Sequence, residues 1–94
     1  MNKPVYTSAA ISDLDSVLEY AARDKPKAAS KLVEIIEAKY LLIASSPEIG
    51  EVHRQLGLDV RSNVVGRYVI FHRHVNDRVE ILRVIPGDRN ITQL

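Results

Sequence analysis

The chain has 94 residues, of which 46% are hydrophobic and 27% charged, so it can form one small globular domain and is too apolar for a disordered chain. It contains no cysteine, which excludes a disulfide framework and thiolate chemistry. The first residues lack the apolar core of a signal peptide, and no segment has the length and hydropathy to span a bilayer, so we expect a cytoplasmic protein without membrane contacts.

The formal net charge is only +1, but the two halves of the chain differ in charge. Residues 1–51 carry eight acidic and six basic side chains, and they contain all five lysines. Residues 52–94 carry seven arginines and four acidic side chains. Arginine makes bidentate contacts with carboxylates and phosphates and does not transfer protons. The second half is therefore expected to contact an anionic partner.

The N-terminal part predicts a short strand and a helix. The stretch "PVYT" (4–7) begins with proline and suits an edge strand. Thr7 or Ser8 can then cap a helix, since small hydroxyl side chains bond the free amides of a first turn. Spacings of three and four predict that its buried stripe contains Ile11, Leu14, Leu18 and Ala21, widened by Val17 and Ala22.

A second helix is predicted over residues 26–45, with Pro26 in its first turn. Only a short link separates it from the first helix, so the two should form an antiparallel hairpin. A helix that is apolar around much of its circumference is deeply buried or is covered on two sides. The apolar stripe of this helix contains Ala29, Leu32, Ile36, Tyr40 and Ile43, and Val33, Ile35 and Leu42 make it unusually broad.

The rest of the chain predicts strands over residues 56–66, 67–75 and 78–86, with a tight turn in "VNDR". Apolar residues occupy both faces of the last two strands, so these should lie centrally and be covered on both sides. The helical hairpin can cover one side, and the C-terminal tail or a partner the other. The prediction is one α+β domain over residues 1–94, ordered β-α-α-β-β-β, with an antiparallel sheet packed on the hairpin.

The segments "LDVRS…VGRYVIFHR" and "VEILRVIPGDR", following a helical hairpin at this distance, resemble the ParE/RelE superfamily of bacterial toxins. The resemblance covers nearly the whole chain and rests on order and spacing. It implies a toxin held inactive by a cognate antitoxin whose disordered tail folds over it. The expected antitoxin groove is the apolar surface of the second helix, unless that surface is internal core; its candidate contacts are Ala29, Leu32, Val33, Ile36, Tyr40 and Ile43.

The superfamily contains two activities, and the sequence favours one of them. RelE-like toxins cleave messenger RNA on the ribosome, and ParE-like toxins bind DNA gyrase and trap its cleavage complex. RelE-like members resemble one another in a lysine after the helices, strand arginines and often a C-terminal tyrosine. Here "EVHRQLGLD" has no lysine, Val69 replaces an expected arginine, "NITQL" has no tyrosine, and only Arg89 matches. This pattern favours a ParE-like gyrase inhibitor that is not an enzyme.

Alternatives remain open on the sequence alone. A RelE-like endoribonuclease would use Arg61, Arg83 and Arg89, with a histidine as the base. A plain nucleic-acid-binding domain is disfavoured by the near-neutral charge, and sequence-specific operator binding is expected of the antitoxin. A toxin that has lost its activity is a further possibility.

Five arginines are the candidates for target binding: Arg61, Arg67, Arg73, Arg83 and Arg89. For Arg83 an internal ion pair, with Glu80 or an antitoxin carboxylate, competes with target contact. Arg89 can pair locally with Asp88 or Asp77, and the remaining three can simply be solvated.

His72 and His74 share one face of a strand and suit acid–base chemistry, or zinc binding if a third ligand lay nearby. Because His53 is the only other histidine and cysteine is absent, we expect no metal and no cofactor.

Overall fold

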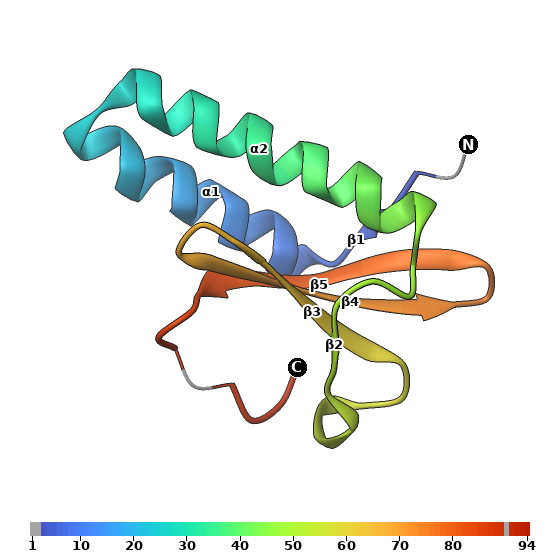
Figure 1. Cartoon of the computed structure of the whole chain (residues 1–94). Coiled ribbons are helices and arrows are strands. Elements are labelled where there is room, and N and C mark those ends of the chain that lie inside the picture. Colours follow the sequence, from blue (N-terminus) through green and yellow to red (C-terminus); the bar gives the residue numbers. More distant parts are fainter. Residues whose placement is uncertain (1–2, 90) are drawn as a thin grey trace.

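The computed structural model describes residues 3–89 and 91–94, which form a helical hairpin on one face of a five-stranded sheet (Figure 1). The predicted α+β class and the placement of the hairpin are confirmed. In chain order the elements are β1 (Val5–Tyr6), α1 (Ser8–Asp24), α2 (Pro26–Ser45), β2 (Glu51–Val52), a short 3-10 helix (Arg54–Leu56), β3 (Val60–Val65), β4 (Tyr68–Val75) and β5 (Arg78–Pro86).

The sheet differs from the predicted one in two respects. Its strand order is β1-β5-β4-β3-β2, and β1 pairs in parallel with β5, so the sheet is mixed. The strand β2, which the sequence did not predict, pairs with Arg61 and Ser62 of β3. A strand of two exposed residues leaves no periodic pattern. Gly50 allows the chain to approach β3 closely at the start of β2. Its φ of +105° favours glycine, and a Cβ there would collide with the Ser62 carbonyl oxygen.

Helix α1 begins as predicted but buries a different face. Thr7 is the N-cap, and its hydroxyl oxygen accepts a hydrogen bond from the Ala10 amide at 3.0 Å. The buried residues of the helix are Ala10 and Val17, whereas Ile11 and Leu18 are exposed, so the predicted stripe was wrong for those two. The helix is turned so that the position between Ala10 and Val17, occupied by Asp13, faces the edge of β5.

Helix α2 matches its predicted range, with Pro26 at its start. Its predicted stripe is confirmed, since Ala29, Ile36, Tyr40 and Ile43 are buried and Leu32 packs against the same cluster. The opposite side of the helix leaves Ile35, Leu41 and Leu42 exposed. The broad apolar surface of the sequence therefore divides into a core face and an open face.

The predicted turn between β4 and β5 is confirmed. Asn76 and Asp77 have φ angles of 51° and 60°, as both central residues of a type I′ turn require. Asn and Asp tolerate this left-handed backbone better than other side chains. The turn thus fixes the register of the two longest strands.

Apolar clusters cover both faces of the sheet, as the sequence predicted for its central strands. On the helix side, buried side chains of both helices pack against β3, β4 and β5. On the opposite side, Val60, Phe71 and Ile85 are packed by Leu56 of the 3-10 helix and Ile91 of the C-terminal tail. Figure 1 shows this tail passing over the face that the helices leave free. Part of the second cover is therefore the chain itself.

The helices of the described residues include none that is both long and apolar enough to cross a membrane.

Candidate functional site

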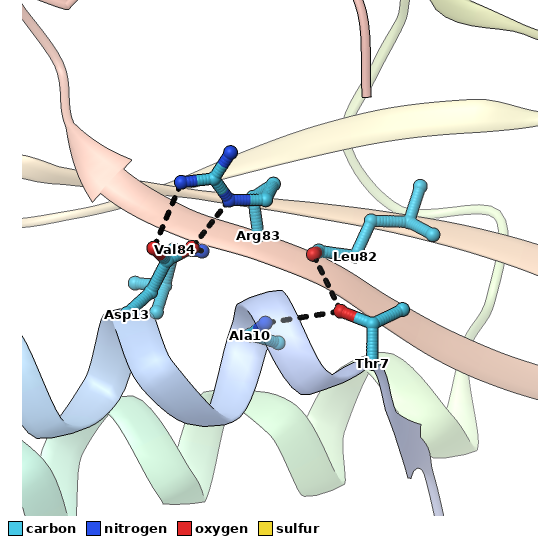
Figure 2. Close-up of polar contacts among 6 residues, drawn as sticks. All are labelled: Thr7, Ala10, Asp13, Leu82, Arg83 and Val84. Carbon is cyan, nitrogen blue, oxygen red and sulfur yellow. Dashed lines mark hydrogen bonds and ion pairs between the residues drawn. The ribbon is translucent and has the colours of Figure 1, made fainter.

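Arg83 is held by helix α1 at the free edge of β5 (Figure 2). Its Nε and Nη2 atoms donate to the two carboxylate oxygens of Asp13 at 2.6 and 2.8 Å, and the Val84 amide donates to Asp13 at 3.1 Å. The side chains of Arg83 and Asp13 are only 25% and 12% exposed. The internal pair predicted as one alternative is confirmed, but with Asp13 in place of Glu80. Arg83 therefore stabilises the contact between α1 and β5 and is not available to bind a target.

Thr7 makes a second contact along the same edge. Its hydroxyl donates to the Leu82 carbonyl oxygen at 2.8 Å, next to the bond between its backbone amide and the Ile81 carbonyl oxygen. Strand β1 pairs with only two residues of β5. Beyond them, residues at the start of α1 form hydrogen bonds with the polar groups along the edge of β5. These bonds fix the position of α1 along β5.

Arg73 lies on β4 opposite Glu80 of β5, and its Nη2 donates to the Glu80 carboxylate at 2.8 Å. This cross-strand pair engages the Arg73 guanidinium within the sheet. Arg61 lies in a different place, beside Arg54 in a groove of about 420 Å³ between β2, the 3-10 helix and β3. Arg61 and Arg73 therefore lie in different surroundings and do not form one shared basic face.

Arg67 and Arg89 are brought together although they are far apart in the sequence. Arg67 lies in the turn after β3, and Arg89 lies in the loop after β5. The Gly87 amide donates to the Arg67 carbonyl oxygen at 2.8 Å, which joins this loop to the turn.

The two arginines line one groove of about 360 Å³, which we call the Arg67–Arg89 groove. Helix α1 forms its other wall with Ser16, Val17 and Tyr20, and the carboxylate of Asp13 lies at its edge. In the described chain no carboxylate lies within ion-pair distance of Arg67 or Arg89. The remaining lining residues are Tyr68, Val84, Ile85, Pro86 and Asp88.

This arrangement suits binding more than bond cleavage. Two open guanidinium groups can contact a carboxylate or phosphate, and the exposed Tyr20 ring can pack against a planar or apolar group. No histidine or lysine of the described residues lines the groove. The arrangement therefore favours recognition of an anionic surface.

The three arginines of the RelE-like alternative do not line a common cavity. Arg61 lies in the groove beside β2, Arg89 lies in the Arg67–Arg89 groove, and Arg83 is paired with Asp13. A nuclease needs such groups around one phosphate. Their separation disfavours a shared catalytic role.

The candidate acid–base histidine His72 is completely buried. Its Nε2 lies 3.2 Å from the Ile49 carbonyl oxygen and 2.9 Å from the side-chain nitrogen of Asn63, and its Nδ1 has no partner in the described chain. Burial lowers the pKa of His72, and the bond to Ile49 opposes this only in part. His72 therefore stays neutral near pH 7 and links β4 to the segment before β2. No group of three side chains suited to hold a metal lies together in the described residues.

The predicted antitoxin contacts need correction. Ala29, Ile36, Tyr40 and Ile43 belong to the core beneath the hairpin, and Leu32 and Val33 are half-buried. A fully buried side chain is not available to a partner while the fold persists, so the four cannot form an open groove. The predicted stripe belonged to the core, which was the competing interpretation.

Comparison with known proteins bears on this fold and these sites. A family model described as the ParE toxin of the type II toxin–antitoxin system parDE matches residues 5–91. The chain belongs to the ParE toxin family. This membership confirms the resemblance found in the sequence and its closer match to ParE. Curated protein sequences give no significant match.

A solved structure titled as a chromosomal ParDE TA system from P. aeruginosa has a similar fold, with a TM-score of 0.79. The two chains are 19% identical, and the match covers 94% of this chain and 98% of the other. The two folds therefore match over nearly the whole length of both chains.

Sequence analysis missed the contribution of α1 to both arginine sites. Asp13, Ser16 and Tyr20 lie outside the stripe predicted for this helix, so no role was predicted for them. One signal was available, because Asp13 lies midway between Ala10 and Val17, which are themselves small or apolar. A helix face built on those residues places the carboxylate next to the sheet.

Proposed function

We propose that this chain is a toxin that binds DNA gyrase, inhibits it, and is neutralised by a cognate antitoxin. Membership of the ParE toxin family supports a toxin–antitoxin role. Gyrase as the target and neutralisation by an antitoxin go beyond family membership, and the chemistry of the sites described above supports them.

The observation that carries the proposal is the pair of open arginines in the Arg67–Arg89 groove. Both are fixed by local backbone bonds, yet their guanidinium groups remain free of carboxylate partners within the described chain. Preorganised arginines of this kind favour binding to an acidic protein surface or a DNA backbone. A gyrase–DNA complex offers both.

The groove also supports a binding mechanism. No histidine or lysine of the described chain lines it, and the arginines of the RelE-like alternative lie apart. Inhibition would then come from occupying one conformation of the target, without any covalent step. A ligand that prefers one conformation shifts its population in this way.

A supercoiling assay tests the proposal. Purified antitoxin-free protein is added to DNA gyrase with relaxed plasmid and ATP, and supercoiled and linear plasmid are measured. We expect loss of supercoiling with accumulation of cleaved DNA. Arg67→Ala and Arg89→Ala together should raise the inhibitory concentration about tenfold or more, because each removes charged hydrogen bonds.

Arg78→Ala is the matched control, since Arg78 is exposed in the turn at the other end of β5. This variant should inhibit like the parent protein. Normal supercoiling in the presence of the folded parent protein would contradict the proposal, and ribosome-dependent mRNA cleavage would be assayed next.

For the antitoxin we propose contact with the open face of α2, where Ile35 and Leu42 are seven residues apart and both exposed. This spacing places them on one side of the helix. Leu42→Lys should weaken antitoxin binding about tenfold, measured by titration calorimetry. Ser30→Lys, also exposed on α2, is the control. Equal affinities for the two variants would move the antitoxin contact elsewhere.

A further inference from the structure

A third groove lies between β1, α1 and α2 and shares no lining residue with the Arg67–Arg89 groove. Its volume is about 190 Å³, enough for one side chain and too small for a folded element. We call it the Tyr40 groove. Its lining residues are Tyr6, Ala10, Ile11, Leu14, Asp15, Glu37 and Tyr40.

One residue that lines the groove, Tyr40, carries a buried hydroxyl group without a hydrogen-bond partner in the described chain. Tyr40 is only 2% exposed, and its Oη has no hydrogen-bond partner in the described chain. Burial raises the pKa of Tyr40 far above its ordinary range, so the hydroxyl stays protonated and neutral. Buried polar groups in native proteins nearly always have a partner. This one lacks a partner within the described chain, and its residue lines a groove that a side chain of another molecule can enter.

The rim of the groove is acidic, and one wall is aromatic. Asp15 of α1 and Glu37 of α2 are its charged residues, and no basic side chain of the described chain lines it. The Tyr6 ring lies against the Tyr40 ring, with centroids 5.3 Å apart, and is itself 42% exposed. A cation is therefore favoured here, and an anion is repelled.

The remaining wall is apolar. Ile11 is 55% exposed and Leu14 is half-buried, so one side of the groove offers hydrocarbon surface. Leu18, also exposed, continues the same side of α1 seven residues beyond Ile11. An occupant therefore needs a charged end, an aliphatic stem and apolar neighbours.

We propose that the Tyr40 groove binds an arginine side chain presented by an apolar segment of a partner protein. The guanidinium group has five donors, which can be shared between the carboxylates of Asp15 and Glu37 that line the groove. Its plane can stack on the Tyr6 ring, and its methylene groups can lie along Ile11 and Leu14. Charge complementarity and the unpartnered hydroxyl select this occupant. The site stands on its own contacts and does not depend on gyrase as the target.

The test is an NMR titration of the whole chain with a short helical peptide that carries one central arginine between leucines. A peptide with citrulline in place of arginine is the uncharged control of the same shape. We expect saturable shifts at Tyr6, Ile11 and Glu37 with the arginine peptide, and at least threefold weaker binding of the citrulline peptide. Equal binding of both peptides, or no shifts at these residues, would overturn the proposal.

Two variants separate binding from folding. Glu37→Gln should weaken binding of the arginine peptide about threefold to tenfold, whereas Glu34→Gln, one turn earlier and outside the groove, should not. Tyr40→Phe removes the unpartnered hydroxyl, so the free protein should melt at the same or a higher temperature while the peptide binds more weakly.

A purely structural role for Tyr40 predicts the opposite pattern, with a lower melting temperature and unchanged peptide affinity. That result would overturn the proposal. Concentration-dependent shifts at the groove without peptide would identify a second copy of this chain as the occupant, which would also overturn it.

Discussion

The arginines of β4 and β5 differ from those that follow the strands. Arg83 and Arg73 lie within strands, and each donates to a carboxylate of its own chain at 2.8 Å or less. Arg67 and Arg89 lie in a turn and a loop, and no carboxylate of the described chain pairs with them. Burying a guanidinium without a partner is costly, and the largely buried Arg83 has its partner in Asp13. The exposed arginines in the turn and the loop keep their contacts with water, so they remain available to a partner.

Removing Asp13 should have the largest effect on stability. Asp13→Ala leaves the Arg83 guanidinium and the Val84 amide without their partner in a largely buried position. We expect the free energy of unfolding to fall by about 2–4 kcal/mol. Urea denaturation measures this change. Asp15→Ala is the control on the same helix, because Asp15 is exposed, and a similar loss in both variants would show that Arg83 is not specially engaged.

The buried His72 should make the stability of the protein depend on pH. His72 is buried with a lowered pKa, so below its ordinary pKa of about 6.5 the unfolded chain binds a proton that the folded chain does not. Stability should therefore fall as the pH falls from 6.5, by up to about 1.4 kcal/mol per pH unit. Denaturation between pH 7 and 5.5 measures the slope.

One variant assigns that slope. His72→Leu should remove it. A slope that persists in His72→Leu would assign the effect to other groups.

The smallest effect on stability is expected at the open arginines. Arg67→Ala and Arg89→Ala should each change the free energy of unfolding by less than about 0.5 kcal/mol, because neither side chain is paired within the described chain. The same variants should lose gyrase inhibition. A stability loss comparable to that of Asp13→Ala would show that these arginines also belong to the fold.

Much of the fold could be predicted because its signals are local. The Thr7 cap, Pro26, the stripe of α2 and the Asn76–Asp77 turn each depend on residues close in sequence. The parallel pairing of β1 with β5 and the strand β2 depend on distant partners, and two residues are too few to show a pattern.

The sites were harder to predict than the fold. The arginines were identified as the important residues, but their division into paired and open groups depends on Asp13 and Glu80, which reach them only in three dimensions. The antitoxin prediction failed for a related reason. A broad apolar helix does not reveal which of its faces the sheet will cover, and the sheet covered Ile36, Tyr40 and Ile43.

The bond from Thr7 to the Leu82 carbonyl spans 75 residues of sequence, and it has a consequence for synthesis on the ribosome. The helical hairpin precedes β5 in the chain, and β5 is one of the strands that cover its apolar face. Contacts of such long sequence separation close late, since they must overcome the entropy of a long loop. The nascent hairpin therefore exposes Ile36 and Ile43 until β5 has been synthesised. The Arg67–Arg89 groove also forms only then, so an incomplete chain lacks the surface proposed to bind the target.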